Sequence, residues 1–170
     1  LKVPGRPPFE TRALSEEEIL EIIRRFAFVA TTARECGFTG VQIHSAHGYL
    51  LSSFLSGLSN TRTDAWGGSL PNRARALLAT VRAVRKAVGP DFPVSVKLNS
   101  SDFQKGGFTN EESVEVVRWL GEEKIDLLEI TGGNYEELPW LEDVKPSTKR
   151  REGYFLDYAK RMQAVATMPL

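Results

Sequence analysis

Apolar residues recur along this chain at two spacings that alternate with each other. Five segments place apolar residues every three to four positions, the spacing of an amphipathic helix. Between them lie short runs of β-branched and other apolar residues, which are typical of buried strands. The pattern therefore predicts helices and strands in alternation.

Most of the predicted helices begin or end at recognisable signals. Ser15 with Glu18, and Thr109 with Glu112, have the spacing of a capping box. Ser69 and Pro71 are a second kind of helix start, and glycines at 37 and 89 are natural stops. We expect helices over residues 15–37, 49–58, 69–89, 109–123 and 154–165.

The predicted strands cover residues 40–44, 93–98 and 127–130, and residues 168–170 resemble the start of another. Polar, glycine-containing loops are expected at 59–68, 99–108 and 131–153. Alternating strands and helices indicate an α/β protein with a parallel sheet, either a TIM barrel or a doubly wound sheet. Neither Gly-x-Gly-x-x-Gly nor Gly-x-x-x-x-Gly-Lys-Ser/Thr occurs, which favours the barrel.

Length limits how much of a barrel this chain can form. A complete barrel takes about 250 residues, whereas three complete strand-helix units account for most of these 170 residues. We therefore expect one domain over residues 1–170 that is part of a TIM barrel, with sheet edges left open.

Composition excludes several classes of partner. Apolar residues make up 41% and charged residues 26%, as in ordinary globular proteins. The 22 basic and 22 acidic residues balance, which disfavours binding to nucleic acid or to an anionic membrane. Cys36 is the single cysteine, and no apolar stretch is long enough to span a bilayer. We expect a cytoplasmic protein with a small-molecule substrate.

The clearest chemistry lies at the end of the first predicted strand, where His44, His47 and Tyr49 fall within six residues. Neutral imidazoles that donate to one oxygen polarise a carbonyl, as an oxyanion hole does. A phenol, with a pKa near 10, can protonate a strongly basic carbon. The alternative is that the histidines are structural and that Tyr49 is a core residue of its helix. Zinc binding is disfavoured, because only the two histidines are obvious ligands there.

Lys97 places a positive charge in an otherwise apolar alternation of Val94, Val96 and Leu98. Lysine seldom occupies such a position without a partner. An anionic ligand or a reduced flavin would supply one, and so would a carboxylate on a neighbouring strand, such as Glu129. Both alternatives stay open on this evidence.

Four stretches, 40–50, 54–56, 59–69 and 72–75, closely resemble the NADH:flavin oxidoreductase, or Old Yellow Enzyme, family. The resemblance extends from Ser15 to the end of the chain. It implies a TIM barrel with FMN at its C-terminal mouth, reduced by NADH or NADPH and oxidised by an activated alkene. It also implies that this chain supplies about strands 4 to 6 and the start of strand 7.

The resemblance also implies roles for the site residues. His44 and His47 would bind the oxygen of the acceptor, and Tyr49 would protonate its α-carbon while flavin N5 delivers hydride to the β-carbon. Lys97 stands where the family commonly has arginine, over flavin N1 and the C2 carbonyl. Lysine keeps the charge but lacks the planar fork, so we expect flavin affinity and redox potential to differ.

Four residues of the signature loop and the following helix are expected to serve packing and surface ion pairs rather than catalysis: Asp64, Trp66, Arg73 and Arg75. The family's phosphate site lies outside this chain, so we expect the chain alone to bind FMN weakly or not at all and to be inactive. The full-length protein is a possible homo-oligomer. Competing interpretations are a 2,4-dienoyl-CoA reductase-type flavoenzyme, a non-catalytic barrel segment and a phosphate-binding aldolase or isomerase.

Overall fold

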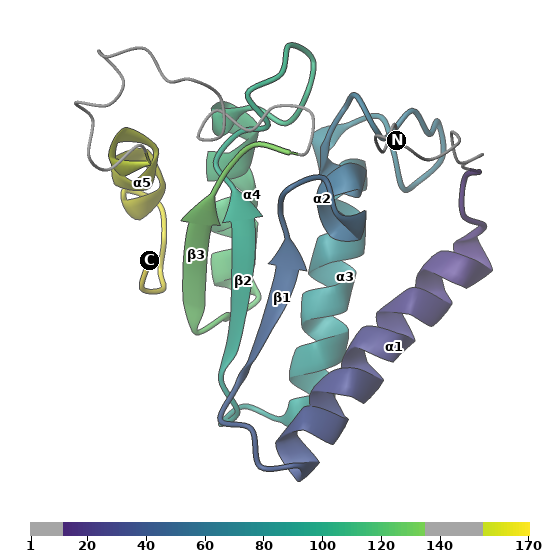
Figure 1. Cartoon of the computed structure of the whole chain (residues 1–170), viewed down its shortest axis with the longest axis vertical. Coiled ribbons are helices and arrows are strands. Elements are labelled where there is room, and N and C mark those ends of the chain that lie inside the picture. The colour runs from purple at the N-terminus through teal and green to yellow at the C-terminus, as the bar shows by residue number, and fades with distance from the viewer. Residues whose placement is uncertain (1–11, 135–154) are drawn as a thin grey trace, which may run out of the picture.

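A parallel sheet of three strands, in the order β1-β2-β3, forms the centre of the fold (Figure 1). The computed structural model describes residues 12–134 and 155–170. The strands are β1 (Val41–Ser45), β2 (Val94–Asn99) and β3 (Leu127–Thr131). All pairings are parallel, so the predicted α/β class and the predicted parallel sheet are confirmed.

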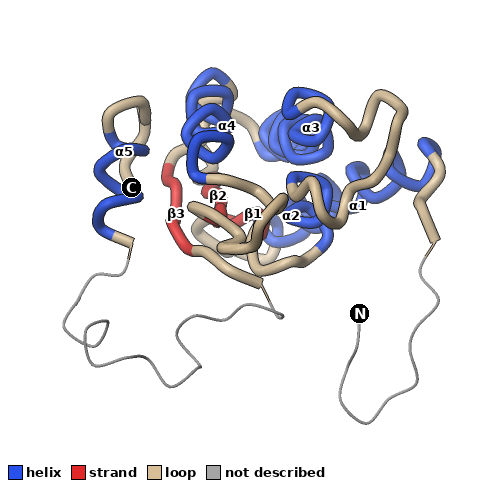
Figure 2. The backbone as a smooth tube through the Cα atoms, turned by 90° about the horizontal axis from the view of Figure 1, so that it is seen from above, coloured by secondary structure: helices blue, strands red, loops and turns tan. Residues whose placement is uncertain are grey.

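Helices connect the strands, and the two longer connecting helices lie behind the sheet in Figure 1. The long helix α1 (Glu16–Glu35) comes before β1, and α5 (Leu156–Gln163) lies beyond β3. The connecting helices are α2 (Leu50–Leu55), α3 (Leu70–Val88) and α4 (Asn110–Glu122). Seen from above, α3 and α4 lie on one side of the strands (Figure 2).

The strand register separates an apolar face from a polar one. Ile43, Val96 and Leu128 are aligned across the sheet, are at most 3% exposed and pack into the core beneath the helices. One position along, His44, Lys97 and Glu129 are aligned on the opposite face. Parallel sheets are usually covered on both faces. Among residues 12–134 and 155–170, no helix covers this polar face.

Helix starts follow the predicted capping signals. Both capping boxes form: Ser15 and Glu18 open α1, and Thr109 and Glu112 open α4. Ser69 is the N-cap of α3, but its side chain makes no capping hydrogen bond. Pro71 lies in the first turn of that helix, where a missing N–H costs little.

The second helix is shorter than predicted. It ends at Leu55 instead of residue 58, because Ser56 is extended. Asn60 Nδ2 donates to the carbonyl of Phe54 at 2.8 Å, and Arg73 donates to the carbonyl of Leu55. These two side chains satisfy carbonyls that a further helical turn would otherwise bond.

The last third of the chain agrees with prediction in part. The helix α5 spans less than the predicted 154–165, and residue 154 lies outside the described residues. Most of the predicted loop 131–153 also lies outside them. Residues 168–170 form no assigned strand, but the carbonyl of Pro169 accepts from Leu128 N at 3.0 Å, so this segment runs beside β3.

The loop predicted at 59–68 is confirmed and is tightly packed. Trp66 is 5% exposed and donates from Nε1 to Glu16 at 3.2 Å. Arg62 donates to the carbonyl of Leu14 at 2.6 Å and also pairs with Asp64. A side chain on Gly67 would overlap the carbonyl of Arg62, so only glycine fits there. The loop therefore anchors the start of α1.

Arg73 is buried rather than on the surface of its helix. It is 7% exposed and forms an ion pair with Glu112 at the start of α4. The expected packing role of the signature loop is confirmed, and the expected surface position is wrong for Arg73. Within the parts of the chain that the structure describes, no helix is long and apolar enough to cross a membrane.

Candidate active site

His44, His47 and Tyr49 lie together at the C-terminal end of β1. The ring centroids of His44 and His47 are 5.3 Å apart, with the rings at 80° to each other. The centroids of His44 and Tyr49 are 4.9 Å apart. The structure thus brings together the three residues that the sequence singled out. In parallel α/β proteins this edge of the sheet is where ligands bind.

A tight change of direction after β1 gathers these side chains. His47 and Gly48 have φ values of 61° and 76°, both in the left-handed region. The amide of Tyr49 then donates to the carbonyl of Ala46 at 3.1 Å, and α2 begins at the next residue. Gly48 suits this turn, because a Cβ there would also come within 3.2 Å of Asn134.

Both imidazoles are biased towards their neutral forms. Partial burial lowers the pKa of His44 below its ordinary value, and the charge of Lys97 lowers it further. The pKa of His47 is also lowered, by burial first and then by His44 and Lys97. Glu129 opposes both shifts but does not reverse them. A neutral imidazole has one N–H donor, which suits the polarisation of a ligand oxygen.

Two residues from the other two strands hold His47, and the sequence did not point to either. Nε2 of His47 lies 2.8 Å from Oγ1 of Thr131 at the end of β3. The backbone N–H of His47 donates to Oδ1 of Asn99 at the end of β2, at 3.2 Å. The only available signal was that both are polar residues at the ends of predicted strands.

Lys97 has a carboxylate partner in this structure. Its Nζ lies 2.7 Å from Oε1 of Glu129, the residue aligned with it on β3. The hydrogen bond from Lys97 is the main reason that the pKa of Glu129 is lowered. Both side chains remain partly exposed, at 26% and 44%. Of the two partners left open by the sequence, the carboxylate is therefore present.

The polar face has the chemistry that a flavin ring would require. His44 Nδ1 is buried and has no hydrogen-bond partner among the described residues. Lys97 is the residue aligned with His44 on β2, and its ammonium, which donates to Glu129, adds donors to the same face. A planar ring with carbonyl oxygens and ring nitrogens offers partners to both kinds of group. These residues thus fit a flavin.

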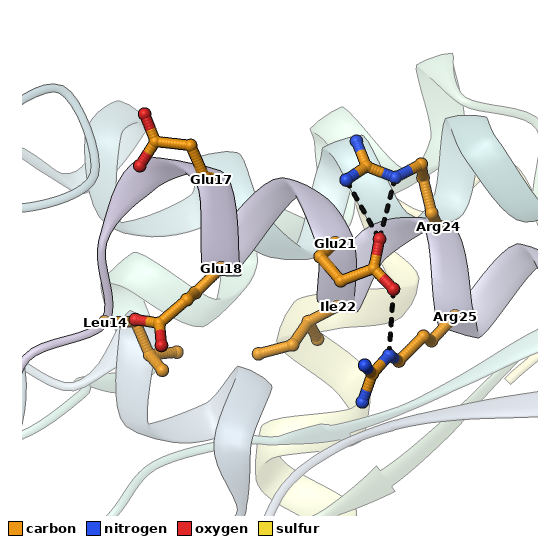
Figure 3. Close-up of a pocket in the computed structure, with 7 residues that line it drawn as sticks. All are labelled: Leu14, Glu17, Glu18, Glu21, Ile22, Arg24 and Arg25. Carbon is orange, nitrogen blue, oxygen red and sulfur yellow. Dashed lines mark hydrogen bonds and ion pairs between the residues drawn. The ribbon is translucent and has the colours of Figure 1, made fainter.

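A hollow on the outer side of α1 does not compete as a site (Figure 3). Glu21 in this hollow pairs with Arg24 and Arg25, and the hydrogen bond from Arg25 is the main reason that its pKa is lowered. These charged groups pair with one another at the surface. The hollow includes none of the residues gathered at the strand ends.

Fold and site together define an α/β protein whose reactive groups sit where barrel enzymes carry theirs. Comparison with known proteins narrows this class. Residues 2–170 match the model of the NADH:flavin oxidoreductase / NADH oxidase family. The NADH-dependent flavin oxidoreductase nadA of Aspergillus parasiticus is 41% identical over 157 residues, covering 92% of this chain and 35% of that protein.

Two solved structures of reductases agree. The chain is similar to 2-naphthoyl-CoA reductase in complex with 2-naphthoyl-CoA, at 36% identity and a TM-score of 0.85, over 93% of this chain and 24% of that one. It is also similar to morphinone reductase in complex with tetrahydroNAD, at 27% identity and a TM-score of 0.71, over 96% and 41%. These neighbours are TIM-barrel enzymes.

The chain belongs to the NADH:flavin oxidoreductase family, the Old Yellow Enzyme type of oxidoreductase, as its resemblance implied. It spans 35% of the length of nadA and 24% and 41% of the two solved chains.

Proposed function

We propose that this chain forms the acceptor-binding part of an FMN-dependent NAD(P)H oxidoreductase that reduces activated alkenes such as enones. The observation that carries the proposal is the convergence of His44, His47 and Tyr49 at the end of a parallel strand. In this proposal β1 to β3 are strands 4 to 6 of the barrel. The polar row of His44, Lys97 and Glu129 then faces the barrel mouth.

The two histidines would bind and polarise the acceptor. Their N–H groups donate to its carbonyl oxygen and stabilise the negative charge that develops there. Lowered pKa values support this role, because they favour the neutral form of both imidazoles. Thr131, at 2.8 Å from His47, fixes the orientation of that ring.

Tyr49 would complete the reaction as the proton donor. FMN, when bound, supplies a hydride from N5 to the β-carbon of the alkene. The phenol of Tyr49 then gives its proton to the α-carbon, so the C=C bond becomes a CH–CH bond. Tyr49 is 46% exposed, which leaves its side chain open to a substrate, and solvent can restore its proton. NAD(P)H is the source of the two electrons that the alkene receives.

Lys97 would supply positive charge to a bound flavin. Its ion pair with Glu129 offsets part of its charge, so it stabilises a reduced, anionic flavin less than an unpaired cation would. This is a physical reason, in addition to the loss of the arginine fork, to expect a redox potential different from that of arginine-containing relatives.

The test uses the full-length protein purified with its flavin. We expect a flavin absorption spectrum and NAD(P)H-dependent reduction of cyclohexenone. His44→Ala and His47→Ala should each lower kcat/KM by roughly 100-fold, the usual effect of one lost oxyanion donor. Arg75→Ala, on the exposed side of α3, is the matched control and should leave it unchanged. A colourless protein, or histidine variants as active as the control, would overturn the proposal.

A second substrate class is favoured by one comparison. The similarity to 2-naphthoyl-CoA reductase, at a TM-score of 0.85, supports an acyl-CoA thioester as the acceptor. The carbonyl of a thioester would meet the same two imidazoles. Comparison of kcat/KM for cinnamoyl-CoA and cyclohexenone decides between the classes. A higher value for the thioester favours the 2,4-dienoyl-CoA reductase type.

A further inference from the structure

One buried amide joins the loops that follow all three strands. Asn99, the last residue of β2, is 1% exposed. Its Oδ1 accepts from His47 N at 3.2 Å, in the loop after β1. Its Nδ2 donates to Oδ1 of Asp102 at 3.0 Å, in the loop after β2, and to the carbonyl of Gly133 at 2.9 Å, after β3. Both polar atoms of this side chain therefore form hydrogen bonds that link the three loops.

The bond to His47 supports a backbone conformation that histidine rarely adopts. With φ at 61°, His47 lies in the left-handed region, which costs energy for a residue with a Cβ. Such a conformation persists only where the surroundings impose it. Asn99 holds the backbone N–H, and a parallel bridge to Asn134 holds the same residue from the loop after β3.

The conformation of the His47 backbone decides where its ring lies. In the observed state, Nε2 is 2.8 Å from Thr131 and the ring centroid is 5.3 Å from that of His44. A return to an ordinary negative φ would redirect the Cα–Cβ bond and separate the two imidazoles. Thr131 is aligned with Asn99 in the sheet register, so both supports of His47 come from one level of the sheet.

We propose that Asn99 is a positioning residue that acts through His47. It holds His47 in the left-handed conformation and so keeps both imidazoles aimed at one ligand oxygen. The inference rests on the proposed function of the histidine pair. It predicts that substitution of Asn99 weakens ligand binding only while the His47 side chain is present.

A double-mutant cycle in the full-length, FMN-loaded protein tests this. The readout is the Kd of 4-hydroxybenzaldehyde, measured from the change in flavin absorbance without turnover. Asn99→Ala should weaken binding about tenfold when His47 is present, as expected for the loss of one well-placed hydrogen bond. In the His47→Ala background, the same change should weaken binding less than about twofold. Equal losses in both backgrounds would overturn the proposal.

Two further variants separate positioning from general support. Asn110 is also buried, and its Nδ2 donates to the carbonyl of Ser100 in the same loop. Asn110→Ala should weaken ligand binding by less than about twofold in either background. The double variant Asn99→Asp/Asp102→Asn keeps the acceptor for His47 and reverses the donor between positions 99 and 102, so that two carboxylates do not face each other. It should keep most of the affinity even if it lowers the Tm. A double variant that binds as weakly as Asn99→Ala would contradict the proposal.

The outcomes also distinguish this inference from the proposed function. If His47→Ala itself leaves ligand binding unchanged, the proposed role of the histidine pair has failed. If His47→Ala weakens binding but Asn99→Ala is additive with it, only the positioning role has failed. Should Asn99→Ala not fold, the cycle is run with Asn99→Asp/Asp102→Asn and His47→Ala, and loss of affinity in Asn99→Asp/Asp102→Asn overturns the inference.

Discussion

Removal of the guanidinium of Arg73 should destabilise the protein more than removal of any exposed arginine. Arg73 is 7% exposed and donates to three acceptors from different elements. These are the carbonyl of Gly68 at 3.1 Å, the carbonyl of Leu55 and the carboxylate of Glu112. Arg73→Met keeps much of the volume of the side chain and removes all of these donors.

The magnitude follows from those contacts. Each carbonyl left without a partner costs about 1 kcal/mol, the lower end of the range. The unpaired carboxylate adds about 1 to 2 kcal/mol. It is a quarter exposed and still accepts from the Thr109 amide at the start of α4, so the full cost of a buried charge does not apply. The total is about 3 to 4 kcal/mol.

Urea unfolding of the full-length protein at pH 7, followed by tryptophan fluorescence, measures this loss. Trp66 is buried against the start of α1 and reports on the same loop. Arg75→Met is the matched control, since Arg75 is exposed and its main contact is with the ring of Trp66 at 5.7 Å. It should cost less than about 1 kcal/mol. Equal losses of unfolding free energy in the two variants would refute the stabilising role assigned to the buried Arg73.

Four further predictions concern the polar face. NMR titration should give pKa values for His44 and His47 below the ordinary value of about 6.5, because burial favours the neutral rings. The contribution of the two histidines to stability is then complete above about pH 6.5, their ordinary pKa, and is lost as the pH falls through the native pKa values. A rise in stability on acidification would contradict the shifts. Glu129→Gln should lower both pKa values further, since its carboxylate favours the imidazolium forms, and unchanged values would show that its charge is screened. Thr131→Val should weaken phenol binding about tenfold through loss of the hydrogen bond to His47, and unaltered binding would mean that the ring is held elsewhere. Lys97→Arg should raise the flavin midpoint potential, because a guanidinium that pairs with Glu129 would still have donors left for a reduced, anionic flavin, and a fall in potential would contradict this reasoning.

Local sequence patterns were sufficient for the parts of the fold that depend on neighbours in the chain. The two capping boxes form as their spacing predicts, because every group involved lies within four residues. The cluster of His44, His47 and Tyr49 was also predictable, since a strand end followed by a glycine turn keeps six consecutive residues close together.

The errors arose where distant side chains decide the local structure. The end of α2 depends on Arg73, which lies 18 residues beyond Leu55, and no periodicity records that contact. The burial of Arg73 depends in turn on Glu112, 39 residues further along. Arg73 therefore looked like a surface charge on an amphipathic helix.

The supports of His47 were missed for the same reason. Asn99 and Thr131 meet it across 52 and 84 residues, and their role appears only when parallel strands bring three strand ends to one edge. A polar residue at the end of a predicted barrel strand was the available signal. The sequence did identify Glu129 as a possible partner of Lys97, but it could not choose between a carboxylate and a ligand.

The central claim is that Tyr49 protonates the acceptor beside two polarising histidines. Stopped-flow measurement of the two half-reactions of the full-length Tyr49→Phe variant tests it most directly. The account predicts that oxidation of the reduced flavin by cyclohexenone slows by at least about 100-fold, the scale of a lost general acid, while reduction by NAD(P)H keeps its rate. An oxidative half-reaction as fast as in the wild type would contradict the account.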